Sequence, residues 1–414
     1  MFKKVGWITA VVVTATSVAG LATAAVLNTQ PEIAPPAQLP QATREFSPVV
    51  GQPADVEKLR ARLDAAAADP RLGKLSGVVR DPSGNVVWER GASDPAKPAS
   101  TTKVLTAAAA LLTLDLDDRI ETQVVRTEPG TVVIRAAGDV MMTDKQLDSL
   151  AQQIGTADTV LIDTSVWSND TFLESWGKEN IGAGFIAPME PAMLYGGRIG
   201  GTRGDLPRST TPAADVAAAL AKRLGANSGT GTAPQGAEVV ASVKSEPLWQ
   251  RLETMMEDSD NVMAEAIGRE VALKRGTGNT VGAAVQATQD ALKEAGFDLT
   301  GLDLKDNSGL SETNYNTPRL LCDILDRATR DAKLRPLLDT LPIAAANGTL
   351  EGRYHDLPGQ GWVRAKTGTL TGVSALAGTV TAADGNTYTF ALLSNDSEIL
   401  AARAGLDDFV STLR

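Results

Sequence analysis

The sequence predicts an α+β protein whose main antiparallel sheet takes strands from both ends of the chain and has helices packed on it. Two short β-branched runs lie near the start of the folded part, and three strand-like runs with a final helix lie at the C-terminus. Between them lies a long segment with strands and helices of its own. We therefore expect the main body to be split in sequence by an inserted region.

The first residues have the pattern of an export signal. Lys3 and Lys4 precede an uncharged, largely apolar stretch that includes small residues of the kind a signal peptidase prefers. We expect residues 1–27 to be a signal peptide or, if uncleaved, a membrane anchor, because about twenty apolar residues span a bilayer. Residues 28–52 are polar and rich in proline, which is typical of an extended tether. The protein is therefore expected outside the cytoplasm, secreted or anchored through this segment.

Residues 53–119 are the first predicted part of the body. Apolar and charged residues at helical spacing predict a helix over 54–68. Two β-branched runs between 77 and 89, joined by a Pro-Ser-Gly-Asn turn, predict a hairpin. Residues 100–114 are rich in Ala and Leu and follow a proline, so they predict a helix.

Residues 120–244 are expected to form one or two inserted domains. The predicted elements are strands over 123–127, 131–136 and 159–163, and helices over 144–154 and 213–224.

Residues 245–414 are the second predicted part of the body. A helix begins near Asn261, and a last helix covers 397–413. The three predicted strands are 363–370, 374–381 and 387–394, the last two joined by a hairpin turn at Asp384-Gly385.

Composition limits the chemistry. Lys and Arg number 39 against 50 Asp and Glu, so the net charge of -11 argues against nucleic-acid binding. The single cysteine, Cys322, cannot form an intramolecular disulfide and is expected in the core; with only one histidine, His355, no Cys-based or His-based metal site is expected. We expect no metal and no cofactor. No G-x-S-x-G motif occurs, so a hydrolase of this sequence is expected to use a base other than histidine. The oligomeric state stays open.

Ser100-Thr101-Thr102-Lys103 is a candidate catalytic motif of the type S-x-x-K. Residues three apart share one face of a helix, so the Lys103 amine can reach the Ser100 hydroxyl. Burial and nearby cations lower the pKa of an ammonium group, and the neutral amine then accepts the serine proton. Ser100 is thus the candidate nucleophile and Lys103 its base, although this motif alone is more often a solvated helix start.

Ser259-Asp260-Asn261 is the second candidate motif, at the start of a predicted helix. Asp258 and Ser259 are expected to cap that helix. The Ser259 hydroxyl is a candidate for relaying a proton to a leaving amine, and the Asn261 amide for holding a substrate carbonyl. On its own the motif is more often a plain helix cap.

Lys366-Thr367-Gly368-Thr369 lies on a predicted strand. Side chains alternate along a strand, so Thr367 faces away from Lys366, and Gly368 allows another chain to approach the backbone closely. Such a strand suits an extended peptide that ends in a carboxylate, with a cation and hydroxyls to receive it. The N–H groups of Ser100 and Thr369 are candidate donors to an oxyanion.

The three motifs, in this order, resemble those of the penicillin-binding proteins and serine β-lactamases. The long gap from Ser100 to Ser259 is similar to that of class C low-molecular-mass penicillin-binding proteins, the D-alanyl-D-alanine carboxypeptidase/endopeptidase family typified by penicillin-binding protein 4. The resemblance extends to Gly138-Asp139, Asp306–Ser311 and Asn347–Leu350. It implies a β-lactamase/transpeptidase-like peptidase domain, with helices on both faces of the sheet and inserted domains in the gap.

The resemblance also implies an activity and roles. Ser100 would be acylated by peptidoglycan stem peptides or by β-lactams, with Lys103 as base. Ser259 would shuttle protons and Asn261 would orient the acyl amide. The side of the substrate that carries the carboxylate would be bound by the third motif: Lys366, Thr367 and Thr369, with Gly368 beside them.

Two departures from the family pattern lie outside the motifs. Asn307 stands where the family usually has glycine, and asparagine is expected to survive there because it tolerates the left-handed conformation. Val140 stands where proline is usual.

Two alternatives remain at this level. A serine β-lactamase is the nearest, because Glu312 and Asn316 have the E-x-x-x-N spacing of a deacylating glutamate, although a loop and helix start explains that spacing as well. The other is a non-catalytic cell-wall-binding homologue. The balance between carboxypeptidase and endopeptidase activity is left open.

Overall fold

The computed structural model describes Gly51 and residues 55–414. The predicted signal peptide or anchor (1–27) and nearly all of the predicted tether (28–52) lie outside the described residues. Within residues 55–414, no helix combines the length and the apolar character that crossing a membrane requires.

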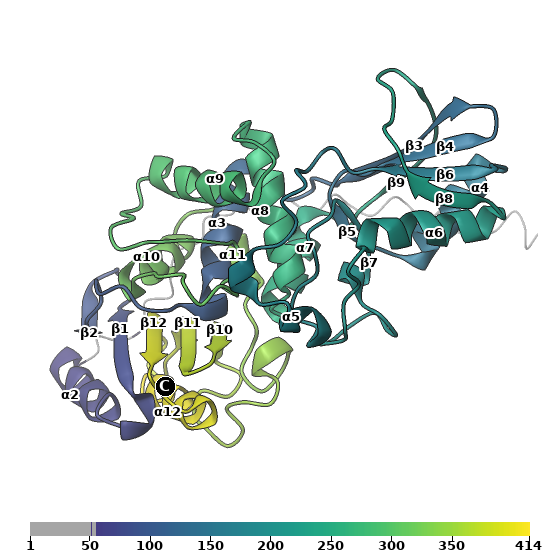
Figure 1. Cartoon of the computed structure of the whole chain (residues 1–414). Helices are drawn as coiled ribbons and strands as arrows, with labels where there is room; N and C mark the ends of the chain where they lie inside the picture. The colour runs from purple at the N-terminus through teal and green to yellow at the C-terminus, as the bar shows by residue number, and fades with distance from the viewer. Residues whose placement is uncertain (1–50, 52–54) are drawn as a thin grey trace, which may run out of the picture. The chain divides into compact units, whose positions relative to one another are not determined.

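A five-stranded antiparallel sheet is built from both ends of the chain, as the sequence predicts (Figure 1). Each neighbouring pair in the order β10-β11-β12-β1-β2 is antiparallel. The α+β fold class is therefore confirmed, and the C-terminal strands lie beside the N-terminal hairpin. The strands are β1 (Lys74–Arg80), β2 (Val86–Arg90), β10 (Val363–Leu370), β11 (Val373–Thr381) and β12 (Thr387–Asn395).

Helices cover both faces of this sheet because its strands are apolar on both sides. Leu376 of β11 faces one core with Phe409, whereas Ala375 and Ala377 face another core with Leu105, as alternation along a strand requires. The first face carries α2 (Val56–Ala66) and α12 (Ile399–Ser411). The second core includes α3 (Lys103–Thr113), α7 (Leu248–Glu257), α8 (Asn261–Arg275), α9 (Val281–Glu294), α10 (Pro318–Ala328) and α11 (Pro336–Asp339).

One helix of the body begins differently from the prediction, and one residue lies where it was predicted to lie. The helix predicted from residue 100 begins as a 3-10 helix over Ala99–Thr102, and α3 starts at Lys103. Cys322 lies buried and unpaired in α10, in the core position expected for it.

The middle of the chain forms a second five-stranded sheet of mixed direction, in the order β8-β6-β4-β3-β9. Helices α4 (Asp144–Ile154) and α6 (Pro212–Leu224) pack on it around a separate core. A parallel pair, β5 with β7, and the short α5 complete this part. Its remaining elements are β3 (Glu121–Glu128), β4 (Thr131–Arg135), β5 (Asp139–Met142), β6 (Thr159–Asp163), α5 (Glu179–Gly182), β7 (Ala192–Leu194), β8 (Asn227–Thr230) and β9 (Glu238–Lys244).

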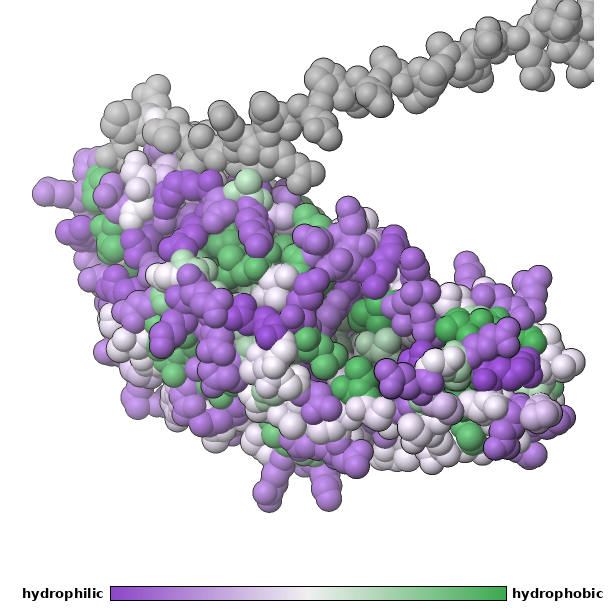
Figure 2. Space-filling model, turned by 90° about the horizontal axis from the view of Figure 1, so that it is seen from above, coloured by the Kyte–Doolittle hydropathy of each residue, from purple (hydrophilic) through white to green (hydrophobic). Residues whose placement is uncertain are grey.

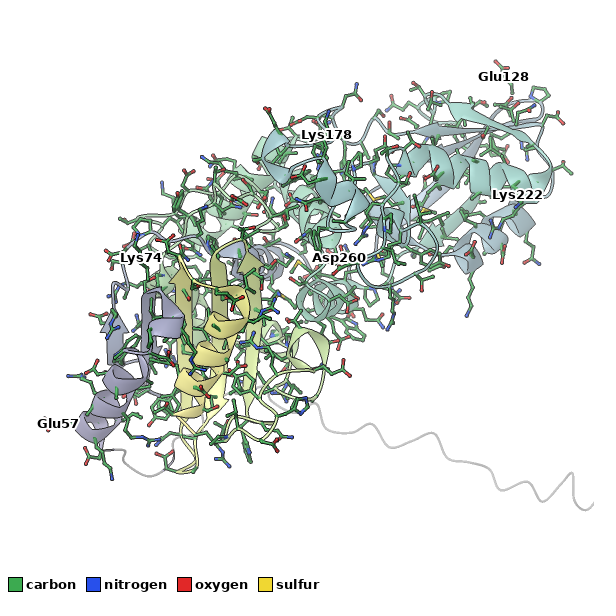
Figure 3. All side chains as sticks on the ribbon, turned by 60° about the horizontal axis from the view of Figure 1, so that its bottom comes forward. Glu57, Lys74, Glu128, Lys178, Lys222 and Asp260 are labelled. Atoms are coloured by element: carbon green, nitrogen blue, oxygen red, sulfur yellow. The ribbon has the colours of Figure 1, made fainter. Side chains whose placement is uncertain are left out.

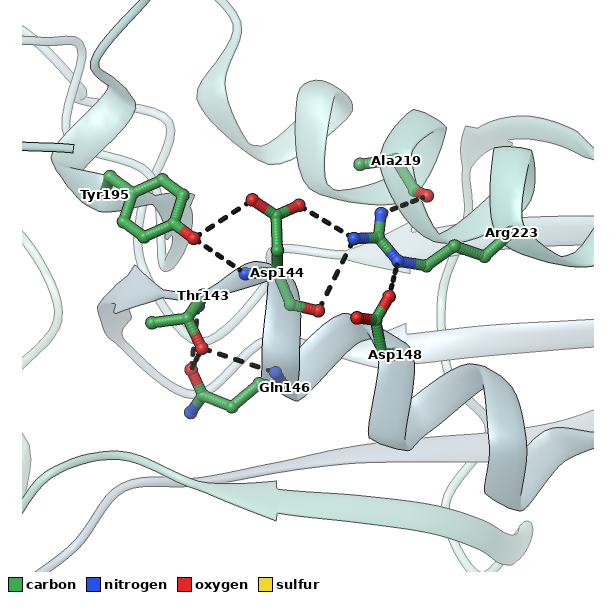
Figure 4. Close-up of polar contacts among 7 residues, drawn as sticks. All are labelled: Thr143, Asp144, Gln146, Asp148, Tyr195, Ala219 and Arg223. Atoms are coloured by element: carbon green, nitrogen blue, oxygen red, sulfur yellow. Dashed lines mark hydrogen bonds and ion pairs between the residues drawn. The ribbon is translucent and has the colours of Figure 1, made fainter. Parts of the chain in front are cut away.

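Figure 4 shows how α4 and α6 are tied together. Thr143 and Gln146 form a reciprocal capping box at the start of α4, which satisfies two backbone N–H groups. Arg223 near the end of α6 contacts both Asp144 and Asp148 at 2.7 and 2.6 Å. Because the acidic partners lie at the N-terminal end of α4, they also oppose the positive end of its dipole.

The surface in Figure 2 is mainly hydrophilic, with apolar residues in small groups among the polar ones. This is the usual surface of a folded protein, in which single exposed apolar residues need no special explanation.

Candidate active site

The 3-10 helix at the start of α3 presents Ser100 and Lys103 to each other. Lys103 Nζ lies 2.9 Å from Ser100 Oγ, which is hydrogen-bond distance. A 3-10 helix has three residues per turn, so side chains three apart lie almost directly in line. Ala99, just before the serine, has a φ of 47°, a strained backbone conformation for a residue other than glycine. The turn thus holds the Ser100 hydroxyl at a sharply defined position.

Lys103 is fully buried and also donates to two oxygens from distant parts of the chain. Its Nζ lies 2.6 Å from Asn261 Oδ1 and 2.7 Å from the carbonyl oxygen of Ser308. Burial lowers the pKa of Lys103 to about 8, although the carboxylates of Asp306, Asp260 and Glu265 act in the opposite direction. At pH 7, roughly one molecule in ten would then carry the neutral amine that accepts a proton.

Ser259 and Lys366 form a second hydroxyl–amine pair on the same site. Lys366 Nζ donates to Ser259 Oγ at 2.9 Å and to the carbonyl oxygen of Thr367 at 3.0 Å. Lys366 is fully buried, so desolvation and the nearby charge of Lys103 hold its pKa well below the usual value. The structure therefore brings Ser100, Lys103, Ser259 and Lys366 into one site.

The helix cap at the second motif differs from the expected one. Asp260 is the N-cap of α8, where its carboxylate accepts from the N–H of Met263, and neither Asp258 nor Ser259 caps this helix. Ser259 instead has a φ of 54°, in the left-handed region. A cap at Asp260 leaves the Ser259 hydroxyl free of the helix backbone, so it can meet Lys366.

Strand β10 is the edge of the main sheet and borders the site. The N–H of Ala365 points to the outer edge, where it donates to Pro342. Because the direction of backbone groups alternates, the N–H groups of Thr367 and Thr369 point to the same edge. Both threonine side chains line the cleft, so this part of the strand is open to pair with an extended ligand.

Gly368 has a different role from the expected one. A Cβ atom here would lie 2.7 Å from the carbonyl oxygen of Pro98 and 3.2 Å from the Cβ of Ala99. Gly368 is buried, and it is not among the residues that line the cleft. The close approach that it permits is that of the Ser100 turn of the same chain, not that of a ligand.

The loop Asp306–Ser311 packs against Lys103 and helps to fix its position. Asp306 is fully buried and accepts four hydrogen bonds: from Trp176 Nε1, Asn314 Nδ2 and the N–H groups of Gly309 and Ser311. A buried carboxylate with this many donors is well satisfied and fixes the loop. The loop in turn brings the Ser308 carbonyl to Lys103.

Asn307 fits this loop for another reason than the one expected from the sequence. It is not among the residues with positive φ, so left-handed tolerance is not what accommodates it. Its side chain lies against Gly268 of α8, and its Oδ1 accepts from Thr288 at 2.6 Å. The asparagine is accommodated because α8 has no side chain at residue 268.

Several of the residues described above line a cleft of about 860 Å³. Ser100, Ser259, Asn261, Thr367 and Thr369 line it, whereas His355 is exposed and does not. Glu312 also lines the cleft, but its side chain is 59% exposed, and Asn316 is buried elsewhere against Ala96. The pair that a deacylating glutamate site would need is therefore not assembled.

Sequence reasoning missed two kinds of cleft residue. Arg353 and Arg403 line the cleft from beyond the three motifs, and Arg403 Nη2 donates to Thr369 Oγ1 at 2.8 Å. Thr349 also lines it and accepts from Thr367 at 2.8 Å. Thr349 belongs to a segment noted for its family resemblance, but no local pattern distinguishes Arg403 from any other helical arginine.

The middle of the chain contributes directly to the site. Asn261 Nδ2 donates to the carbonyl oxygen of Phe185 at 2.9 Å, and Trp176 Nε1 donates to Asp306 at 2.9 Å. The side chain of Asp260, labelled in Figure 3, is fully buried. Its carboxylate lies 2.7 Å from the guanidinium of Arg198 and 3.6 Å from that of Arg208. These two arginines outweigh the effect of burial and lower the pKa of Asp260, so it stays ionised.

Within the part of the chain that the structure describes, no group of three or more His, Cys, Asp or Glu side chains is arranged to hold a metal ion.

Comparisons with known proteins place the chain in a family. The model of a family described as D-Ala-D-Ala carboxypeptidase 3 (S13) matches residues 59–205 and 198–413. Carboxypeptidase DacB of Mycolicibacterium smegmatis is 42% identical over 385 residues, which cover 86% of this chain and 84% of that protein. Carboxypeptidase Rv3627c of Mycobacterium tuberculosis is 41% identical over 395 residues, covering 88% and 86%.

A solved structure has the same fold. The crystal structure of penicillin binding protein 4 (dacB) from Haemophilus influenzae superimposes with a TM-score of 0.72 and 24% identity, covering 87% of this chain and 98% of that one. The overall fold of the chain is therefore shared with that protein.

Proposed function

Because the chain belongs to the D-Ala-D-Ala carboxypeptidase 3 (S13) family, we propose that it is a serine-type D-alanyl-D-alanine carboxypeptidase with Ser100 as nucleophile. The observation that carries the assignment to Ser100 is its 2.9 Å contact with a buried lysine at the mouth of a cleft beside an edge strand. We infer the roles below from the same geometry.

Acylation begins when neutral Lys103 takes the proton of Ser100. The Ser100 oxygen attacks the carbonyl carbon of the penultimate D-alanine, and the N–H groups of Ser100 and Thr369 receive the developing oxyanion. The first amides of a helix have no partner within it, and that of Thr369 faces the open edge, which suits both to this role. The C–N bond then breaks and leaves an acyl-enzyme.

Ser259 supplies the proton route for the leaving group. Its hydroxyl gives a proton to the departing amine of the terminal D-alanine and is replenished through Lys366, to which it is bonded. The proton that Lys103 took from Ser100 makes good the one lost by the Ser259–Lys366 pair, so Lys103 is neutral again. A water molecule then attacks the ester carbonyl and gives a proton to Lys103, which passes it to the Ser100 oxygen as the ester bond breaks. This step releases the shortened peptide and restores the Ser100 hydroxyl.

Asn261, Thr367 and Thr369 bind the substrate. Asn261 is held by Lys103 on its oxygen and by Phe185 on its nitrogen, which fixes the amide at the cleft wall. Thr367 and Thr369 present hydroxyls along the strand edge, where an extended peptide pairs with the backbone. The third motif thereby positions the scissile bond over Ser100.

Peptidoglycan stem peptides and β-lactams are the proposed partners. The Haemophilus influenzae relative has been crystallised in complex with a β-lactam, which supports the second of these. The proposed place of action is outside the cytoplasm, on the cell-wall side, with membrane contact through residues 1–27 if that segment is retained. Endopeptidase activity on cross-linked peptides is a further proposal for the same acyl-enzyme chemistry.

The test uses the purified protein and two substrates. We expect release of D-alanine from an N-acyl-D-Ala-D-Ala peptide, and a covalent adduct with fluorescent penicillin that lasts for hours in an intact-mass measurement. Ser100→Ala should abolish both while the circular dichroism spectrum stays unchanged.

Other outcomes would support the alternatives. Rapid loss of the adduct with turnover of penicillin would indicate a β-lactamase. Neither D-alanine release nor labelling would indicate a non-catalytic cell-wall-binding protein.

A further inference from the structure

Arg403 is a partly buried cation at the cleft without an ionic partner. It lies on α12, and its guanidinium donates to the neutral hydroxyl of Thr369 at 2.8 Å. Among the described residues, no Asp or Glu carboxylate lies within the 4.0 Å of an ion pair with it. A guanidinium that has lost part of its water without gaining an anion is costly, so the site favours a negatively charged ligand.

The neighbouring negative charge is already used by another arginine. Arg353 contacts Asp407 through two nitrogens, at 2.6 and 3.1 Å, in the two-pronged geometry that arginine and carboxylate prefer. Desolvation and the proximity of Arg353 both lower the pKa of Arg403, although a guanidinium remains charged at any physiological pH. Arg403 is thus a charge in the cleft wall that no described side chain neutralises.

Lys366 of the third motif does not provide an equivalent charge. Lys366 is buried beside Lys103, and its donors are directed at Ser259 and at the Thr367 carbonyl. Since its pKa is held far below that of a free lysine, it is a weak source of positive charge for an anion. Arg403 is therefore the better candidate to receive a carboxylate at the Thr369 end of the strand.

We propose that Arg403 binds the C-terminal carboxylate of the peptide together with the Thr369 hydroxyl, and that this contact selects peptides with a free C-terminus. The inference rests on the proposed function, because only that reaction brings a terminal D-alanine carboxylate to this end of β10. A planar guanidinium beside a hydroxyl offers donors to both carboxylate oxygens. The contact also holds the leaving D-alanine residue against the edge of β10 and so orients the scissile bond.

The experiment compares two substrates that differ only at the C-terminus. An N-acyl-D-Ala-D-Ala peptide and its C-terminal amide are assayed for kcat/KM with the wild type, Arg403→Gln and Arg403→Lys. We expect Arg403→Gln to lose about a hundredfold on the acid, in line with loss of a buried charged contact, and less than about threefold on the amide. Arg403→Lys keeps the charge but not the planar guanidinium with two donors. Its loss of kcat/KM on the acid should lie between those two values.

Arg364→Gln is the matched control. It also removes one arginine charge, from the strand that carries Thr369, but residue 364 is exposed and does not line the cleft. Its preference for the acid should equal that of the wild type.

The outcomes separate this inference from the proposed function. If Arg403→Gln keeps the preference for the acid, or loses equally on both substrates, Arg403 does not recognise the carboxylate and the inference is wrong. If the wild type hydrolyses neither substrate and is not labelled by penicillin, the proposed function is wrong, and so is this inference, which rests on it.

Discussion

Lys103 and Lys366 are two buried amines in one site, and both have a lowered pKa. Burial is the larger cause for both, and the charge of Lys103 is a further cause for Lys366. Carboxylates offset this for Lys103, because Asp306, Asp260 and Glu265 all raise its pKa. Glu265 itself has a pKa raised to about 8 by burial, so these groups titrate together rather than singly.

The protonation of Lys103 predicts the pH dependence of acylation. Only the neutral amine accepts the Ser100 proton, so the second-order rate constant for penicillin should rise with pH and level off above about 8, the pKa of Lys103. The measurement is the rate of labelling by fluorescent penicillin between pH 5 and 10, corrected for hydrolysis of penicillin without enzyme. Lys103→Arg, which stays protonated, should not be labelled at any of these pH values.

A flat profile between pH 6 and 9 would contradict this assignment of the base. It would mean that the group titrating with a pKa of about 8 does not control the attack.

The residues of the three motifs could be found from sequence because their spacing follows local geometry. Ser100 and Lys103 are one turn apart, and Thr367 and Thr369 share a strand face. Contacts between distant segments could not be found in this way. The packing of Gly368 on Pro98 depends on how strand β10 packs against the turn that carries Ser100. The hydrogen bond from Arg403 to Thr369 depends on how α12 packs on the sheet.

At the scale of elements, α8 and the Asp306–Ser311 loop are matched through Gly268 and Asn307. An added Cβ at residue 268 would lie 2.4 Å from Asn307 Nδ2, a distance that forces the asparagine or the helix to move. Asn307 Nδ2 is buried and finds no hydrogen-bond partner among the described residues, so the amide is tightly confined. The loop that holds Ser308 against Lys103 is therefore sensitive to this one pair.

We predict that Gly268→Ala destabilises the protein by about 1–3 kcal/mol through overpacking, and that Asn307→Gly in the same chain removes most of this penalty. The thermal midpoints of the wild type, both single variants and the double variant form the cycle that measures the coupling. Gly282→Ala is the control, because that helical glycine in α9 has nothing closer than 3.9 Å to an added Cβ. It should be neutral or slightly stabilising, as alanine favours helix.

Additive effects of Gly268→Ala and Asn307→Gly would refute the pairing. So would a loss of stability from Gly282→Ala as large as that from Gly268→Ala.

At the scale of the whole molecule, the sequence predicted the main sheet well and the middle of the chain less well. Strands β10, β11 and β12 begin and end within one residue of their predicted limits, because they are long, apolar and separated by clear turns. Strand β8 was missed because Asn227–Thr230 is short and polar, and its place in the sheet depends on pairing with β6. Parallel pairing of this kind leaves little local signal.

We propose that residues 120–244 are an inserted domain region within a body made of 53–119 and 245–414. Its second sheet and separate core support this division. Its contacts with the site come from the segment that carries Trp176, Phe185, Arg198 and Arg208, not from the loop between β8 and β9. The same region therefore has one part that positions the site and another that does not.

Cutting the chain in each part tests this division of roles. A specific protease site replaces residues 202–205 in one variant and 232–236 in another; both segments are largely exposed. Cleavage at 202–205 should lower the rate of penicillin acylation by about tenfold or more, because Arg198 is bonded to Gly204 and holds Asp260 at the start of α8. Cleavage at 232–236 should leave the rate within about twofold of the uncut form of the same variant. If both cuts reduce acylation equally, the inserted region acts on the site as one unit; if neither does, its contacts with Asp260 and Asn261 are not needed to position Ser259.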